Sequence, residues 1–226
     1  MCVLAASFCL YGLRCRSGKI ATDGRQFLIG CAGLGVLAAA FVTPLCNLSV
    51  ALFAARSVQH VLMLLVAAPL LVIGLPRGRV GRWESRVAPI GFGVVLWCWH
   101  LPRFYDATLQ NNVIYWAMHI TLFGVSLSLW RVILSERGIA ASLFTGVQMS
   151  ALGALLTLSP RPWFSVYAAT TWPWGLSPAA DQQLGGAIMW IVGGVLLSGF
   201  TIMALARLFA DPGSGRRSSF ASTSWG

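Results

Sequence analysis

The chain has 226 residues, of which 57% are hydrophobic and only 10% are charged, and its formal net charge is +10. Soluble domains carry about 25% charged residues, so this composition excludes an ordinary soluble domain and indicates a polytopic membrane protein. In such a protein an excess of Lys and Arg reports which loops face the cytoplasm, and we do not take it as evidence for nucleic-acid binding.

Six apolar stretches are candidates for membrane-spanning helices, which need about 18 residues or more. They cover residues 27–45, 57–75, 88–101, 113–134, 139–157 and 179–207, of which 88–101 is short and could start near Val87. A further apolar stretch, Met1 to Leu13, would reach only about 20 Å as a helix, against a hydrocarbon core of about 30 Å. It lacks preceding basic residues, which argues against a signal peptide. We interpret it as a truncated first helix, which makes seven helices in total.

The basic residues fall on alternate connections between these stretches. Thirteen lie on one side if the helices alternate, and three lie on the other: Arg56, Arg103 and Arg161. The positive-inside rule then places the N-terminus outside and the C-terminus in the cytoplasm. The sequence therefore predicts an all-α, polytopic transmembrane helix bundle. Residues 1–210 form a single domain, and the Arg-, Ser- and Gly-rich residues 211–226 form a disordered cytoplasmic tail.

Several functional classes lack their sequence signals. No Walker loop, GxGxxG, nucleophile elbow or zinc-finger spacing occurs, and no nucleophile–base pair is visible, so the sequence does not predict an enzyme. The six cysteines form no CxxC pair and suit small apolar packing. Cys46 and Cys98 lie near the outer ends of two predicted helices, which leaves a disulfide or a soft metal ligand open.

All three histidines fall in the outer third of the predicted membrane region. His60 lies in the first turn of the helix at 57–75, His100 at the end of 88–101 and His119 in the second turn of 113–134. Ionisable groups at membrane depth face protein or water rather than lipid. One polar cluster is therefore the economical interpretation.

The chemistry of such a cluster suits a transition metal. Imidazole ligates copper, and thioether sulfur selects Cu(I). Met63 shares a helix face with His60, and Met189 lies two turns deeper than Asp181; Met118, next to His119, points away and ranks lower. Two histidines on facing helices could instead hold a haem.

Structural roles explain the same polar residues without a ligand. His100 precedes Leu101-Pro102 and could simply end a helix, and Asp106 could cap the next one. Asp181 lies in the first turn after Ser177-Pro178, where a carboxylate complements the helix dipole. That leaves the amides of the neighbouring pair unexplained: Gln182 and Gln183.

Four segments resemble a known family in order and spacing: VQHVLMLLVAAPLLVIGLP, WHLPRFYDATL, GALLTLSPRPWF and WGLSPAADQQLGGAIMWIVGG. Over roughly residues 10–210 the chain is similar to the CtaG-type cytochrome c oxidase assembly factors, the bacterial multi-span family associated with caa-type oxidases. The resemblance implies a seven-helix protein of the bacterial inner membrane. It also implies a role in maturing a haem–copper oxidase, at a copper-insertion step.

The resemblance carries over to individual positions. The residues that match the polar motifs of the family are His60, His100, Tyr105, Asp106, His119, Asp181, Gln182, Gln183 and Met189. Three positions depart from it: Arg56 stands where relatives often have a histidine, and Tyr115 and Met118 stand where they often have histidine and glutamate. These departures predict a metal site with fewer ligands or with different ones. Tyr115, Met118 and Cys98 are secondary candidates for it.

The leading hypothesis is thus an oxidase assembly factor that holds copper transiently near the outer membrane face. Its expected partners are cytochrome c oxidase subunits, a periplasmic copper donor and membrane lipid, with no nucleic acid. The alternatives are a membrane scaffold or small transporter without a metal, and a haem-binding electron-transfer module.

Overall fold

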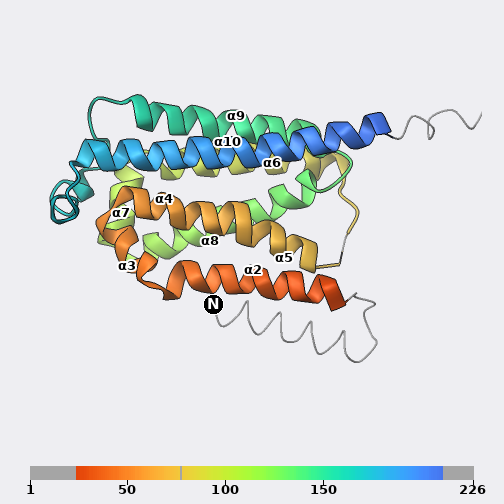
Figure 1. Cartoon of the computed structure of the whole chain (residues 1–226), viewed down its shortest axis with the longest axis horizontal. Coiled ribbons are helices and arrows are strands. Elements are labelled where there is room, and N and C mark those ends of the chain that lie inside the picture. The colour runs from red at the N-terminus through yellow and green to blue at the C-terminus, as the bar shows by residue number, and fades with distance from the viewer. Residues whose placement is uncertain (1–23, 77, 211–226) are drawn as a thin grey trace, which may run out of the picture.

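The computed structural model describes residues 24–76 and 78–210, and the regular structure in these ranges is helical. Its elements are α2 (Gly24–Val42), α3 (Pro44–Ala51), α4 (Phe53–Val61), the π-helical η1 (Leu62–Ala67), α5 (Ala68–Gly74), α6 (Arg82–Trp99), α7 (Pro102–Gln110), α8 (Asn112–Ile133), α9 (Gly138–Leu158), the 3₁₀ turns η2 (Ser165–Tyr167) and η3 (Trp172–Trp174), and α10 (Pro178–Ala210). The long helices run side by side, with α3 and α7 gathered at one end of the bundle (Figure 1). The all-α prediction is confirmed.

Within the described residues, five helices are long and apolar enough to cross a membrane. They are α2, the continuous helix Phe53–Gly74, α8, α9 and the first 29 residues of α10. The sequence predicted six full spans. The sixth predicted span corresponds to α6, which does not meet this composition criterion because its 18 residues include Arg82, Glu84 and Arg86. The predicted first helix, Met1 to Leu13, and the predicted tail at 211–226 lie outside the described residues.

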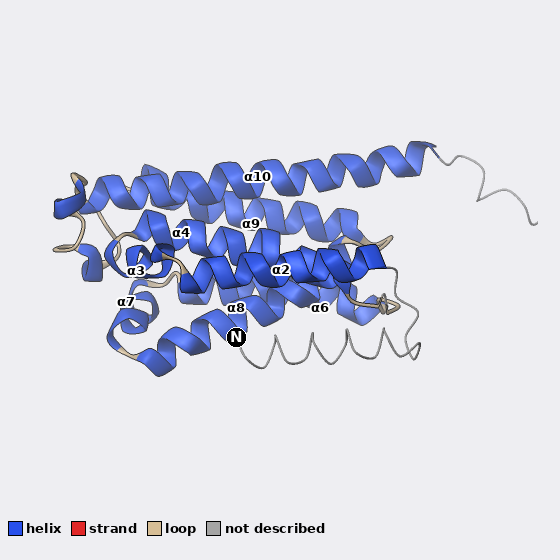
Figure 2. Cartoon of the chain, turned by 60° about the horizontal axis from the view of Figure 1, so that its bottom comes forward, coloured by secondary structure: helices blue, strands red, loops and turns tan. Residues whose placement is uncertain are grey.

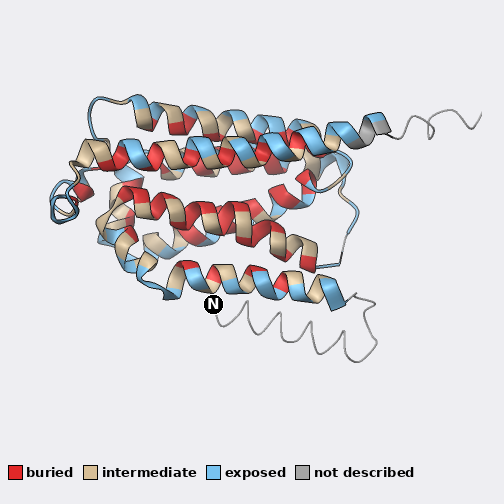
Figure 3. Cartoon of the chain, in the orientation of Figure 1, coloured by how far each residue is buried: buried red, intermediate tan, exposed pale blue. Residues whose placement is uncertain are grey.

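The continuous helix Phe53–Gly74 is the centre of the bundle. In its apolar window 67% of the residues are buried, against 22–39% for the other candidate spans. Figure 3 shows this helix as the most continuously buried one. α10 packs against its first part, α4, and α2 packs against η1 and α5. Polar side chains on this helix therefore face protein rather than lipid.

The π-helical turn in the middle of this helix has a local cause. Pro69 has no backbone N–H, and its ring would clash with the carbonyl group one turn earlier, so the ladder of hydrogen bonds is interrupted. The carbonyl oxygen of Leu64 is taken up by α8, where Ser126 Oγ donates at 2.9 Å and Trp130 Nε1 at 2.7 Å. Neighbouring helices thus satisfy the freed backbone group, as a membrane interior requires.

Several predicted boundaries were wrong. The central helix begins at Phe53 rather than residue 57, so His60 is its eighth residue and not part of its first turn. The stretch predicted as 27–45 ends at Val42, because Thr43-Pro44 begins the separate helix α3. α7 was not predicted as a helix at all. Figure 2, turned by 60°, shows α3, α7 and the loop at 159–177 together beyond the same end of the long helices.

Candidate functional site

Three histidines from three helices form one buried cluster near the end of the bundle that carries α3 and α7. His60 comes from the last turn of α4, His100 is the residue that ends α6, and His119 comes from α8. The ring centroids of His60 and His119 are 5.3 Å apart, and those of His60 and His100 are 6.5 Å apart. All three side chains are buried. The fold thus brings together side chains that lie 59 positions apart along the chain.

The hydrogen bonds of the imidazoles determine which nitrogen atoms are free. Nδ1 of His100 lies 2.7 Å from the Leu96 carbonyl oxygen, and Nδ1 of His119 lies 2.9 Å from that of Tyr115. Because a carbonyl can only accept, both Nδ1 atoms carry the proton, and Nε2 then has a lone pair. Nε2 of His119 and Nε2 of His60 are buried without a hydrogen-bond partner. Orphaned polar atoms of this kind are rare and call for a ligand or water.

Arg56 is the site residue that the sequence analysis missed. It lies one helical turn before His60 on the same face and is fully buried. Its Nη1 donates to Thr108 Oγ1 at 2.8 Å, whereas Nε and Nη2 have no partner. Its Cζ lies 5.4 Å from the ring centroids of both Tyr105 and Tyr115. Counted at first as one of three outer arginines, it is instead an internal cation, and its spacing from His60 was the available signal.

The three predicted sulfur ligands are all buried. Met63 lies in η1, Met118 precedes His119 in α8, and Met189 lies on α10. Within residues 24–76 and 78–210, no group of three or more His, Cys, Asp or Glu side chains is placed to hold a metal ion. The two facing imidazoles of His60 and His119 are therefore the donor pair that the geometry offers.

Asp181 and Gln182 hold the fold together at this end. The carboxylate of Asp181 accepts hydrogen bonds from the backbone N–H groups of Phe53 (2.6 Å) and Ala54 (3.0 Å), the first two residues of α4. Gln182 accepts from the N–H of Trp163 and donates to the carbonyl oxygen of Leu156 at 3.2 Å. These two residues of the DQQ motif thus anchor the central helix and the loop at 159–177.

The glycines that follow allow α10 to approach two neighbours closely. A Cβ on Gly185 would collide with Phe53 of α4, and one on Gly186 would lie 2.8 Å from the Gly153 carbonyl oxygen of α9. The side chain of Gln183, by contrast, is exposed, and its Nε2 lies 3.5 Å from the Ser159 carbonyl oxygen.

Tyr105 and Asp106 connect α7 to the loop at 159–177. The Tyr105 ring stacks on Phe164 with centroids 4.0 Å apart, and its hydroxyl group lies 3.2 Å from that of Tyr167. Asp106 Oδ2 accepts from Ser165 Oγ at 2.6 Å, so Asp106 lies within α7 and is not the cap of the next helix. Burial raises the pKa of Tyr105 to about 12 and the pKa of Tyr167 well above its ordinary value.

The remaining secondary candidates lie at the edge of the cluster or away from it. The Tyr115 ring is 4.2 Å from the His119 ring, and its hydroxyl group is 3.9 Å from Cys46 Sγ. Cys98 is exposed, and both Cys46 and Cys98 are free thiols, so the disulfide left open by the sequence is not formed.

These features define a polytopic helical membrane protein with a buried polar centre of three imidazoles and one guanidinium. A family model described as cytochrome c oxidase caa3 assembly factor matches residues 8–83 and 83–211. No curated protein and no solved structure matches the chain. The chain therefore belongs to the caa3 cytochrome c oxidase assembly factor family, and the resemblance predicted from its sequence motifs is confirmed. Membership of this family gives the chain a role in oxidase assembly.

Proposed function

We propose that this chain assists assembly of the oxidase by holding Cu(I) transiently between His60 and His119. The observation that carries the proposal is the pair of buried Nε2 atoms without partners, on rings 5.3 Å apart. Neutral imidazole is a copper ligand. Bound there, the copper ion would be the cargo that is passed to the oxidase.

The surrounding residues tune this pair toward weak binding. The hydrogen bond of His119 Nδ1 to the Tyr115 carbonyl oxygen fixes the tautomer and leaves a lone pair on Nε2, as backbone carbonyls do for metal-ligating histidines. Met63, three residues after His60, and Met118, next to His119, are buried thioethers on the two helices that carry the pair. The unpaired charge of Arg56, one turn from His60, opposes a second cation. A site with good donors and a built-in opposing charge suits a protein that must also release its metal.

A scaffold without a metal is the second candidate, and specific contacts favour it. Asp181, Gln182 and Asp106, which match the motifs of the family, form hydrogen bonds that hold helices and loop together. In that case the histidines would only fill the core, and the chain would act on the oxidase by contact alone. A haem-binding module is a third candidate, which a Soret band in the purified protein would reveal.

The decisive experiment is complementation of a strain that lacks the protein. We expect His60→Ala/His119→Ala to give oxidase with a reduced ratio of copper to haem. Excess copper in the medium should restore part of the lost copper content. Gln183→Ala, at an exposed position of the DQQ motif, serves as the matched control and should behave as wild type. A folding defect would lower the amount of the variant in the membrane and would not respond to copper. Full copper content with the double variant would exclude direct metal handling.

A further inference from the structure

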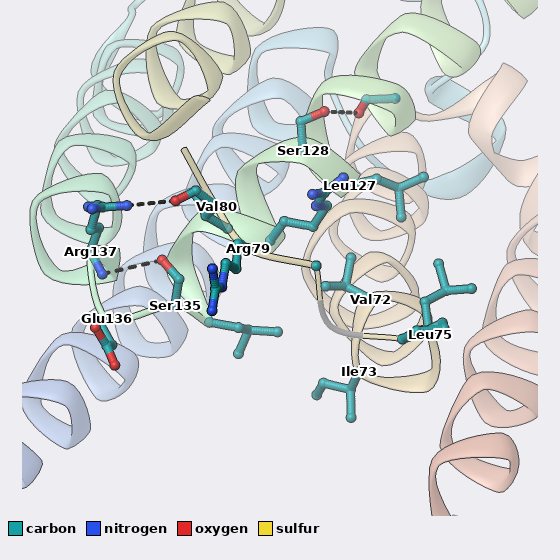
Figure 4. Close-up of a pocket in the computed structure, with 15 residues that line it drawn as sticks. Val72, Ile73, Leu75, Arg79, Val80, Leu127, Ser128, Ser135, Glu136 and Arg137 are labelled. Atoms are coloured by element: carbon teal, nitrogen blue, oxygen red, sulfur yellow. Dashed lines mark hydrogen bonds between the residues drawn. The ribbon is translucent and has the colours of Figure 1, made fainter. Parts of the chain in front are cut away.

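A separate cavity lies at the opposite end of the bundle, away from the histidine cluster. Its volume is about 1000 Å³, and it is bounded by the end of α5, residues 75, 76 and 78–80, the end of α8 and the turn between α8 and α9. Figure 4 shows these elements with their side chains directed into the same space. This is the arginine-rich end of the chain, the one that the positive-inside rule places at the cytoplasmic face.

Three guanidinium groups line this cavity: Arg79, Arg131 and Arg137. Arg137 Nη1 donates to the Val80 carbonyl oxygen at 2.6 Å, and Arg131 Nε lies 3.4 Å from Glu84 Oε1. Arg79 is exposed and has no ion pair within the described part of the chain. Glu136 is the single acidic residue of the lining, so the cavity carries an excess of positive charge with free N–H donors.

The same cavity has an apolar wall. Val72, Ile73 and Leu127 line it, together with Leu75 and Leu134, which are 40% and 37% exposed. Gly124 also lines it, and a Cβ at this position would meet nothing within 4 Å. A ligand that fits must therefore combine an anionic group for the arginines with an aliphatic part for this wall.

We propose that this cavity binds the headgroup of an anionic phospholipid, with the first part of its acyl chains against the apolar wall. Phosphate is recognised by guanidinium groups through charge-assisted hydrogen bonds. Basic pockets between membrane helices on the cytoplasmic side bind anionic headgroups. The leucine and isoleucine side chains distinguish this site from one for free phosphate, which would gain nothing from them. The proposal does not depend on copper handling.

The test is native mass spectrometry of the detergent-purified protein titrated with dioleoyl phosphatidylglycerol or dioleoyl phosphatidylcholine. We expect one phosphatidylglycerol retained in preference to phosphatidylcholine, and roughly tenfold weaker retention in Arg79→Gln/Arg137→Gln. Arg82→Gln/Arg86→Gln removes the same charge from exposed positions outside the cavity and should match wild type. An equal loss of phosphatidylglycerol retention in both double variants, or no preference for phosphatidylglycerol over phosphatidylcholine in wild type, would overturn the proposal.

Two further measurements separate the lipid from simpler explanations. Gly124→Leu adds a side chain whose Cβ meets nothing within 4 Å and keeps all arginines, so it should reduce lipid retention without lowering the melting temperature. Unchanged retention in this variant would contradict a lipid seated against the apolar wall. Inorganic phosphate at millimolar concentration should not displace the retained lipid, and displacement would indicate a phosphate site instead.

Discussion

The imidazole rings of His60 and His119 meet nearly edge to face, 5.3 Å apart and inclined by 68°, and each buries an Nε2 atom that has no hydrogen-bond partner. In a protein core, two Nε2 atoms without hydrogen-bond partners cost free energy unless a ligand or a water molecule binds to them. Their placement on α4 and α8 couples the central helix of the bundle to its neighbour.

Arg56 should weaken binding of a cation to this pair. Replacing it by glutamine removes a buried positive charge one helical turn from His60, and we expect Cu(I) affinity to rise by roughly tenfold or more, as expected for like charges several ångströms apart in a partly polar interior. Arg103→Gln, at an exposed position of α7, is the matched control. Competition with a chromogenic Cu(I) chelator measures the change. Equal or lower affinity in Arg56→Gln would show that the guanidinium does not oppose the metal.

Asp181 should be the main anchor of the beginning of α4. Leu52, which precedes this helix, has no side-chain cap, and the carboxylate of Asp181 on α10 accepts from the first two backbone N–H groups instead. Asp181→Ala should lower the unfolding free energy by about 2 to 4 kcal/mol, because two buried donors lose a charged acceptor. Asp181→Asn keeps one acceptor oxygen, so its unfolding free energy should lie between those of wild type and Asp181→Ala. A melting temperature of Asp181→Ala equal to that of wild type would refute this role.

The phenol of Tyr105 should make the fold sensitive to alkaline pH. Its pKa is raised by burial to about 12 in the folded state, against about 10 for an exposed phenol. The folded state therefore retains a proton that the unfolded chain loses, and stability that is fully present below pH 10 declines as the pH rises towards 12. Melting temperatures in detergent at pH 9 and pH 11.5 measure the loss. Tyr105→Phe should show a smaller decline than wild type, and an identical decline would count against this assignment.

The positions of the long helices could be read from hydrophobicity, but their ends could not. The central helix begins four residues before the apolar pattern suggests, because its first N–H groups are satisfied by Asp181 from a segment 127 positions away along the chain. α7 escaped prediction because nine residues with Arg103, Asp106 and Gln110 carry no membrane signal. Such ends depend on tertiary contacts that local sequence does not contain.

The histidine cluster could be predicted because alternate helix directions place three residues at one membrane depth. The count of basic residues missed Arg56 as a buried cation because it treats every arginine as a solvent-exposed charge, although the spacing of Arg56 from His60 was an available signal. The functions of Asp181 and Gln182 in anchoring α4 and the loop also required the structure, since their partners are backbone groups of distant segments.

Copper stoichiometry after anaerobic Cu(I) loading tests the central claim most directly. We predict about one copper ion per chain that is present in wild type and in Gln183→Ala, and absent from His60→Ala/His119→Ala. The free thiols of Cys31, Cys46 and Cys98 are the same in all three proteins, so the difference between them reports the imidazole pair. Equal copper in the double variant and wild type, or none in either, would contradict a metal site at His60 and His119.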